Sequence, residues 1–102
     1  MMKGKERAEL RAEAHHLDPM VHIGHQGLTD TALGALDDAL RTHELVKVAV
    51  ARTIETSPKA LANEMAEALG ADVIQAIGRK VTLYRHNPDL WEKPRATPPW
   101  KG

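Results

Sequence analysis

Two capped helix starts, separated by a run of β-branched residues, constrain the fold of this 102-residue chain more than any other feature. Thr29-Asp30 combines a side chain that can cap free backbone N–H groups with an acid at the positive end of the helix dipole. Ser57-Pro58 places an N-cap residue before a proline at the first helical position. Between them, residues 45–50 carry alternate valines that fall on one side of an extended chain. Helices and strands are therefore expected to alternate.

Hydrophobic spacing and turn residues predict the remaining elements. Asp18-Pro19 ends a first amphipathic segment, because the residue before proline is disfavoured in the helical region. Gly70 suits the left-handed position that follows a helix. The predicted elements are a helix over 4–17, a strand over 20–23, a helix over 29–42, a strand over 45–50, a helix over 57–69, and a hairpin of strands 73–77 and 81–85.

The element order α-β-α-β-α-β-β predicts an α/β fold. Strands joined by helical crossovers imply parallel pairing, and the terminal hairpin adds antiparallel pairing, so a four-stranded mixed sheet with packed helices is expected. A chain of this length suits one compact domain, which we assign to residues 1–86. Residues 87–102 contain four prolines and both tryptophans and are expected to form an irregular basic tail.

The composition excludes several kinds of protein. The chain has no cysteine, so disulfides, thiolate metal sites and cysteine nucleophiles are absent. No apolar run approaches the roughly 20 residues of a membrane span, and residues 1–5 lead into charge rather than into a signal peptide. A cytoplasmic protein with no membrane partner is expected.

Catalytic and metal sites are not predicted by the spacing of the polar residues. His15 and His16 are neighbours on a helix and face different ways, and His22 falls on a strand, so we expect neither a metal site nor another cofactor. No spacing suggests a Ser/His/Asp arrangement. The acid pairs Asp37-Asp38 and Glu64 with Glu67 are best interpreted as solvated helix faces. We therefore expect no enzyme and no small-molecule substrate.

The net charge of zero conceals an uneven distribution along the chain. Fourteen Lys and Arg residues balance fourteen Asp and Glu residues. Basic residues are in excess by two over 1–11 and by four over 79–102, whereas acidic residues are in excess by six over 12–78. Because charges farther apart than a Debye length of about 8 Å are mostly screened, a binding surface responds to local charge. A neutral chain is therefore compatible with a polyanionic partner if the fold gathers its basic residues.

Gly24-His25-Gln26-Gly27 is the motif that bears most directly on function. Two glycines bracket two polar residues between a predicted strand and the helix capped by Thr29, so the backbone can approach a ligand without obstruction by Cβ atoms. Free N–H groups and the positive end of the helix dipole then lie beside the loop, and phosphate suits that arrangement. KH domains use a GxxG loop to clamp nucleic-acid backbone. The alternative is that both glycines only make a tight turn.

Three sequence blocks together resemble the CRM domain, and more narrowly the small bacterial proteins of the YhbY type. The blocks are VHIGHQGLT at 21–29, HELVKV at 43–48 and AIGRKVTLYR at 76–85, and the resemblance covers residues 4–86. It implies a fold similar to the C-terminal domain of translation initiation factor three. It also implies binding to ribosomal RNA, association with precursors of the large ribosomal subunit, and a role in their assembly.

The resemblance also implies which residues meet RNA. The loop from Gly24 through His25 and Gln26 to Gly27 matches the family's GxxG loop, although the family often has basic or small residues where this chain has His25-Gln26. Lys47 matches the lysine of the second block. Arg79, Lys80 and Arg85 match the basic hairpin and strand end. Phosphate contacts by such residues give affinity and salt dependence without reading the base sequence.

Other interpretations of the chain stay open. One alternative is a protein-interaction module that docks on a ribosomal protein or an assembly factor through the sheet edge or the tail. Another interpretation of the chain is a small metal-dependent enzyme. In the tail, Trp91 is expected to pack back on the domain, while Trp100 could stack on an unpaired base. We expect a monomer that binds RNA.

Overall fold

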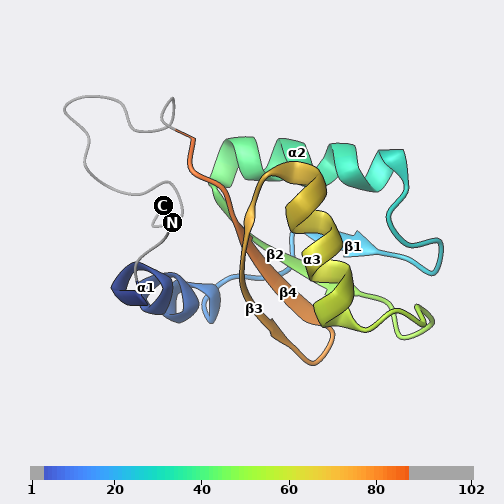
Figure 1. Ribbon diagram of the computed structural model, residues 1–102, viewed down its shortest axis with the longest axis horizontal. Helices are drawn as coiled ribbons and strands as arrows, with labels where there is room; N and C mark the ends of the chain where they lie inside the picture. Colours follow the sequence, from blue (N-terminus) through green and yellow to red (C-terminus); the bar gives the residue numbers. More distant parts are fainter. Residues whose placement is uncertain (1–3, 88–102) are drawn as a thin grey trace.

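A computed structural model describes residues 4–87 of the chain. It contains three helices and four strands in that range: α1 (Gly4–Ala14), β1 (Val21–Ile23), α2 (Asp30–His43), β2 (Leu45–Val50), α3 (Pro58–Leu69), β3 (Asp72–Ile77) and β4 (Lys80–Tyr84). The predicted order α-β-α-β-α-β-β is therefore confirmed (Figure 1). The predicted tail, with Trp91 and Trp100, lies outside the described residues.

The four strands form one mixed sheet in the order β1-β2-β4-β3. β1 runs parallel to β2, with Ile23 opposite Val50, and β4 runs antiparallel to both β2 and β3. A two-residue turn of Gly78 and Arg79 closes the hairpin, because Ile77 pairs with Lys80. Gly78 has a φ of 58°, a conformation that glycine adopts without steric cost.

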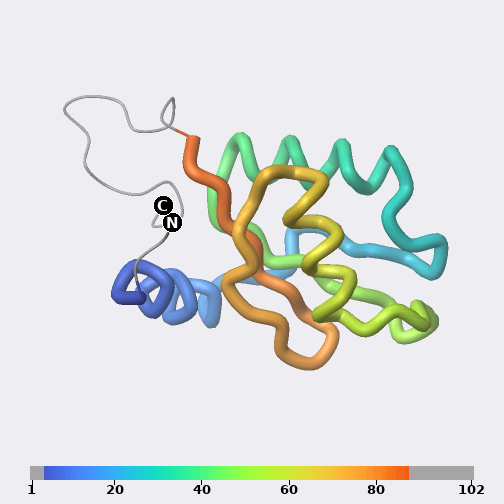
Figure 2. Tube along the Cα trace, in the orientation of Figure 1, coloured from blue at the N-terminus to red at the C-terminus, as the bar shows by residue number. Residues whose placement is uncertain are grey.

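Both faces of the sheet carry apolar side chains, and helices lie on both faces (Figure 2). α2 and α3 cover the face that carries the alternate valines of β2. The buried residues of this main cluster are Ile23, Leu36, Leu40, Val46, Val48, Val50, Ile54, Leu61, Ala62, Met65, Val81 and Leu83. On the other face α1 covers a smaller cluster of Leu10, Leu45 and Ile74. The single domain predicted from the chain length therefore has its buried residues in two layers, one on each face of the sheet.

The helix ends follow the predicted capping chemistry. The Thr29 hydroxyl accepts a hydrogen bond from the Ala32 N–H at 3.1 Å, and the Ser57 hydroxyl accepts one from the Ala60 N–H at 3.2 Å. Gly70 ends α3 with a φ of 64°. α1 ends at Ala14 rather than at residue 17, because hydrogen bonds between residues three apart replace the helical pattern from His15 onward.

Side chains fasten α1 to the sheet although few of its residues are buried. The Arg7 guanidinium donates to the Val73 carbonyl, next to an irregularity in the pairing of β3 with β4. The Lys47 ammonium donates to the Ala14 carbonyl at the end of α1, over a distance of 3.1 Å. No helix among residues 4–87 is long and apolar enough to cross a membrane.

Candidate functional site

One end of the sheet gathers three connecting segments, and we call it the loop end: residues 24–29, 51–57 and 78–80. The parallel pairing of β1 with β2 places the exits of both strands there, and the antiparallel pairing of β4 adds the hairpin turn. Backbone hydrogen bonds join the segments, from Ala51 N–H to Ile23 O at 2.9 Å and from Val50 N–H to Arg79 O at 2.8 Å. Figure 1 shows the first two segments side by side at the right. The fold therefore positions the GxxG motif and the hairpin turn at the same end of the sheet, on either side of the chain that leaves β2.

The two glycines of the motif have different structural requirements. Gly27 has a φ of 75°, which an L-residue adopts only with strain, and its N–H donates to the Gly24 carbonyl at 2.9 Å. Gly24 has no positive φ, and a Cβ built there meets no atom within 4 Å. The tight-turn interpretation therefore explains Gly27 and leaves Gly24 unexplained. A ligand that approaches the backbone closely would account for the missing side chain at Gly24.

Three cationic side chains lie at the loop end. Arg79 is exposed in the hairpin turn, and its guanidinium donates to the Ala51 carbonyl at 3.2 Å. Lys80 is exposed at the start of β4, between Ala49 of β2 and Ile77 of β3. Arg52, which the sequence analysis did not select, is exposed in the segment after β2. The parallel pairing of β1 with β2 is the signal that identifies Arg52, because it places the residues that follow the two strands at the same end of the sheet.

Lys47 and Arg85, also predicted as RNA contacts, lie elsewhere. Lys47 is half-buried on the face covered by α1 and binds the Ala14 carbonyl. Arg85 follows β4 at the opposite end of the sheet, where its guanidinium donates to Asp37 Oδ1 at 2.9 Å and to the Leu69 carbonyl at 3.0 Å. These contacts connect α2 with the end of α3. Both residues lie away from the loop end, and the contacts described for them are with other parts of the same chain.

A fully buried carboxylate, Glu44, lies at that opposite end. It follows α2 with a φ of 63°, and its Oε2 accepts a hydrogen bond from the Asn87 N–H at 2.6 Å and lies 3.2 Å from His86 Nδ1. Burial, followed by the negative charge of Glu44, raises the pKa of Tyr84 to about 12. No motif in the sequence indicates this polar cluster, which joins the end of α2 to the segment that follows β4.

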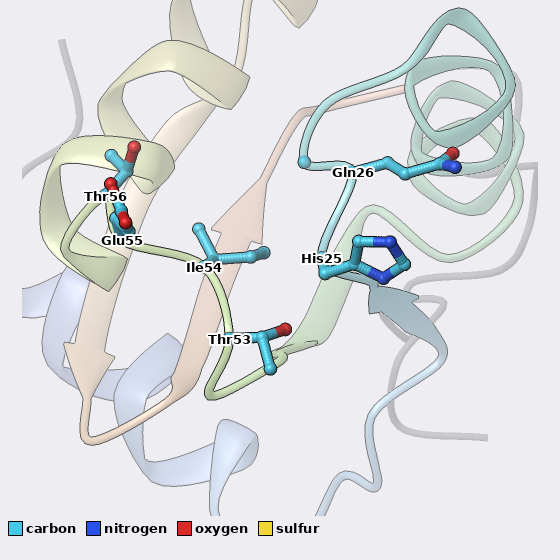
Figure 3. Close-up of a pocket in the computed structure, with 7 residues that line it drawn as sticks. His25, Gln26, Thr53, Ile54, Glu55 and Thr56 are labelled. Atoms are coloured by element: carbon cyan, nitrogen blue, oxygen red, sulfur yellow. The ribbon is translucent and has the colours of Figure 1, made fainter.

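A groove of about 600 Å³ opens at the loop end between the GxxG loop and the segment before α3. Its lining residues are His25, Gln26, Gly27, Thr53, Ile54, Glu55 and Thr56. In Figure 3 the side chains of His25 and Gln26 extend away from the opposite segment, whereas Ile54 projects towards the loop. Among residues 4–87, no group of three His, Asp or Glu side chains is placed to hold a metal ion.

Comparison with known proteins agrees with this architecture. The sequence matches the profile of the CRS1 / YhbY (CRM) domain over residues 2–85. The chain belongs to the CRM-domain family. Within this family it is 30% identical over 89 residues to "Probable RNA-binding protein YqeI" of Bacillus subtilis, covering 87% of this chain and 93% of that protein. It is 37% identical over 81 residues to an "RNA-binding protein" of Haemophilus influenzae, covering 79% and 82%.

A solved structure shares the fold of this CRM domain. The solution structure of the hypothetical protein SAV1595 from Staphylococcus aureus superposes with a TM-score of 0.74 at 34% identity. The match covers 85% of this chain and 91% of that one. The family resemblance carried by the three sequence blocks and the α/β fold predicted from the order of the elements are thereby confirmed.

Proposed function

We propose that this CRM-domain protein binds ribosomal RNA through its loop end and acts, without catalysis, on precursors of the large ribosomal subunit. The observation that carries the proposal is the convergence of the GxxG loop, the start of α2 and the cations Arg52, Arg79 and Lys80 at one end of the sheet. Backbone N–H groups and cationic side chains are the groups that most proteins use to bind phosphates. The RNA-binding names of its relatives support the same partner.

Gly24 is central to this interface. Its lack of a side chain serves no contact within the described fold, whereas it would let a phosphate reach the backbone of the loop. Thr29 caps α2 with its hydroxyl and keeps the start of the helix beside the loop. Arg79 and Lys80 would then hold neighbouring phosphates of the same strand. These contacts recognise RNA backbone and shape rather than base sequence.

The salt dependence of binding tests the proposal. The double variant Arg79→Ala/Lys80→Ala should bind a ribosomal RNA fragment more weakly, and the slope of log affinity against log salt concentration should fall by up to about two units. Lys5→Ala/Arg11→Ala removes the same charge from exposed positions on α1 and serves as the matched control. An unchanged affinity and slope for the hairpin variant would remove Arg79 and Lys80 from the interface.

One observation favours the alternative of a protein partner. Ile77, at the end of the edge strand β3, is 61% exposed. An edge strand offers unpaired backbone groups and this apolar side chain to another protein chain. Co-purification with ribosomal proteins that survives nuclease treatment and is lost in Ile77→Ser would support this function instead.

A further inference from the structure

The groove at the loop end differs in chemistry from the cationic surface beside it. One wall is the glycine-containing loop, where Gly27 brings no side chain, and the other carries the Ile54 side chain, which is only 9% exposed (Figure 3). Thr53, Glu55 and Thr56 complete the lining, and each carries a polar side chain. The groove therefore has both apolar and hydrogen-bonding residues in its lining.

A phosphate is a poor occupant for this groove. The carboxylate of Glu55 would repel it, and the cations of the loop end belong to neighbouring positions rather than to the lining. A nucleobase has the opposite character, since its faces are apolar and its edge carries donors and acceptors. RNA held by its phosphates at Arg79 and Lys80 would bring unpaired bases close to the groove.

We propose that the groove holds one unpaired nucleobase and that Glu55 makes it selective for guanine. Guanine presents two adjacent N–H donors, N1–H and N2–H, to the two oxygens of a carboxylate. Uracil offers one such donor, flanked by carbonyl oxygens that a carboxylate repels. The small exposed part of the Ile54 side chain would contact the base, and Gly27 leaves room for it. This inference rests on the proposed RNA binding and adds to it a base preference that phosphate contacts do not supply.

Four RNA hairpins that differ only in the central nucleotide of a single-stranded loop test the inference. The full chain should bind the guanine hairpin about tenfold more tightly than the uracil hairpin, the discrimination expected of one bidentate contact. Glu55→Gln should weaken binding to the guanine hairpin while leaving the uracil hairpin unchanged or bound more tightly, because a negative charge is removed near RNA. A loss of folding would weaken binding to both.

Glu67→Gln is the matched control, since it removes the same charge from an exposed position near the end of α3. It should leave the guanine preference intact. Equal affinity of the wild-type chain for all four hairpins, with Arg79→Ala/Lys80→Ala still weakening them, would overturn the groove assignment and leave the RNA interface standing. Binding that is insensitive to both changes would overturn the interface and the groove together.

Discussion

Single residues at the loop end separate the requirements of folding from those of binding. Gly27 has a positive φ that the turn needs, whereas Gly24 has neither a positive φ nor a neighbour within 4 Å of a built Cβ. Two glycines of one motif therefore have different reasons to be glycine. That difference is visible in the backbone conformation and not in the sequence, where both positions look alike.

Alanine substitutions should resolve the two roles. Gly24→Ala should keep or raise the free energy of unfolding by up to about 1 kcal/mol, because alanine restricts the unfolded chain, yet weaken RNA binding about three- to tenfold. Gly27→Ala should lower the free energy of unfolding by about 1–2 kcal/mol. Urea denaturation and RNA titration of both variants give the two quantities. Full RNA affinity in Gly24→Ala would argue that the loop backbone does not contact RNA.

Tyr84 provides a pH-dependent probe at the opposite end of the sheet. Burial and the nearby charge of Glu44 raise its pKa to about 12, and it is the chain's single tyrosine, so ultraviolet absorbance follows it alone. Since its pKa in the unfolded chain is about 10, its contribution to stability is complete below pH 10 and is lost as the pH rises towards 12. Glu44→Gln should lower the titration midpoint, and a midpoint already near 10 in the native wild type would contradict this account.

At the scale of elements, the local chemistry of the sequence predicted helices and strands well. Thr29 and Ser57 cap α2 and α3 as expected, and residues 45–50 form the predicted strand without a shift. Caps and alternating valines act within a few residues, so the sequence carries them directly. The register of the sheet and the position of α1 depend on contacts between distant segments, which the sequence pattern does not contain.

The candidate site was predictable only where the family resemblance and the strand register agree. Arg79 and Lys80 lie in the predicted hairpin, which the sheet places at the loop end, whereas Arg85 lies at the far end, five residues along an extended strand. A basic residue near a motif in sequence can therefore be distant from it in space. Arg52 is the opposite case. It is distant from the GxxG motif in the sequence, and the pairing of β1 with β2 places it at the same end of the sheet.

Arg85 is expected to act on stability rather than on RNA affinity. Its guanidinium donates to the side chain and the backbone carbonyl of Asp37 and to the Leu69 carbonyl, so Arg85→Ala should lower the free energy of unfolding by about 1–3 kcal/mol. The salt slope of RNA binding should stay at the wild-type value. Denaturant titration measures the first quantity. A slope reduced by about one unit, with stability unchanged, would return Arg85 to the interface.

At the scale of the whole molecule, the fold places in different regions some of the acidic and basic residues whose charges cancel in the total. The acidic middle segment places Asp37 and Asp38 on α2, where they pair with Arg41 and Arg85, while Arg52, Arg79 and Lys80 gather at the loop end. A balanced total charge is expected to keep binding to generic RNA weak, so that the shape of the target contributes to selection. Local charge and backbone access, rather than net charge, define the proposed interface.

Crosslinking of the full chain to ribosomal RNA, followed by mass spectrometry of the crosslinked peptides, tests the proposed interface most directly. The crosslinked residues should fall within 24–29, 51–57 and 78–80, the three segments of the loop end. The RNA-free control should yield none of these adducts. Crosslinks confined to α1 and to residues 84–87, with the loop end unmodified, would contradict the account.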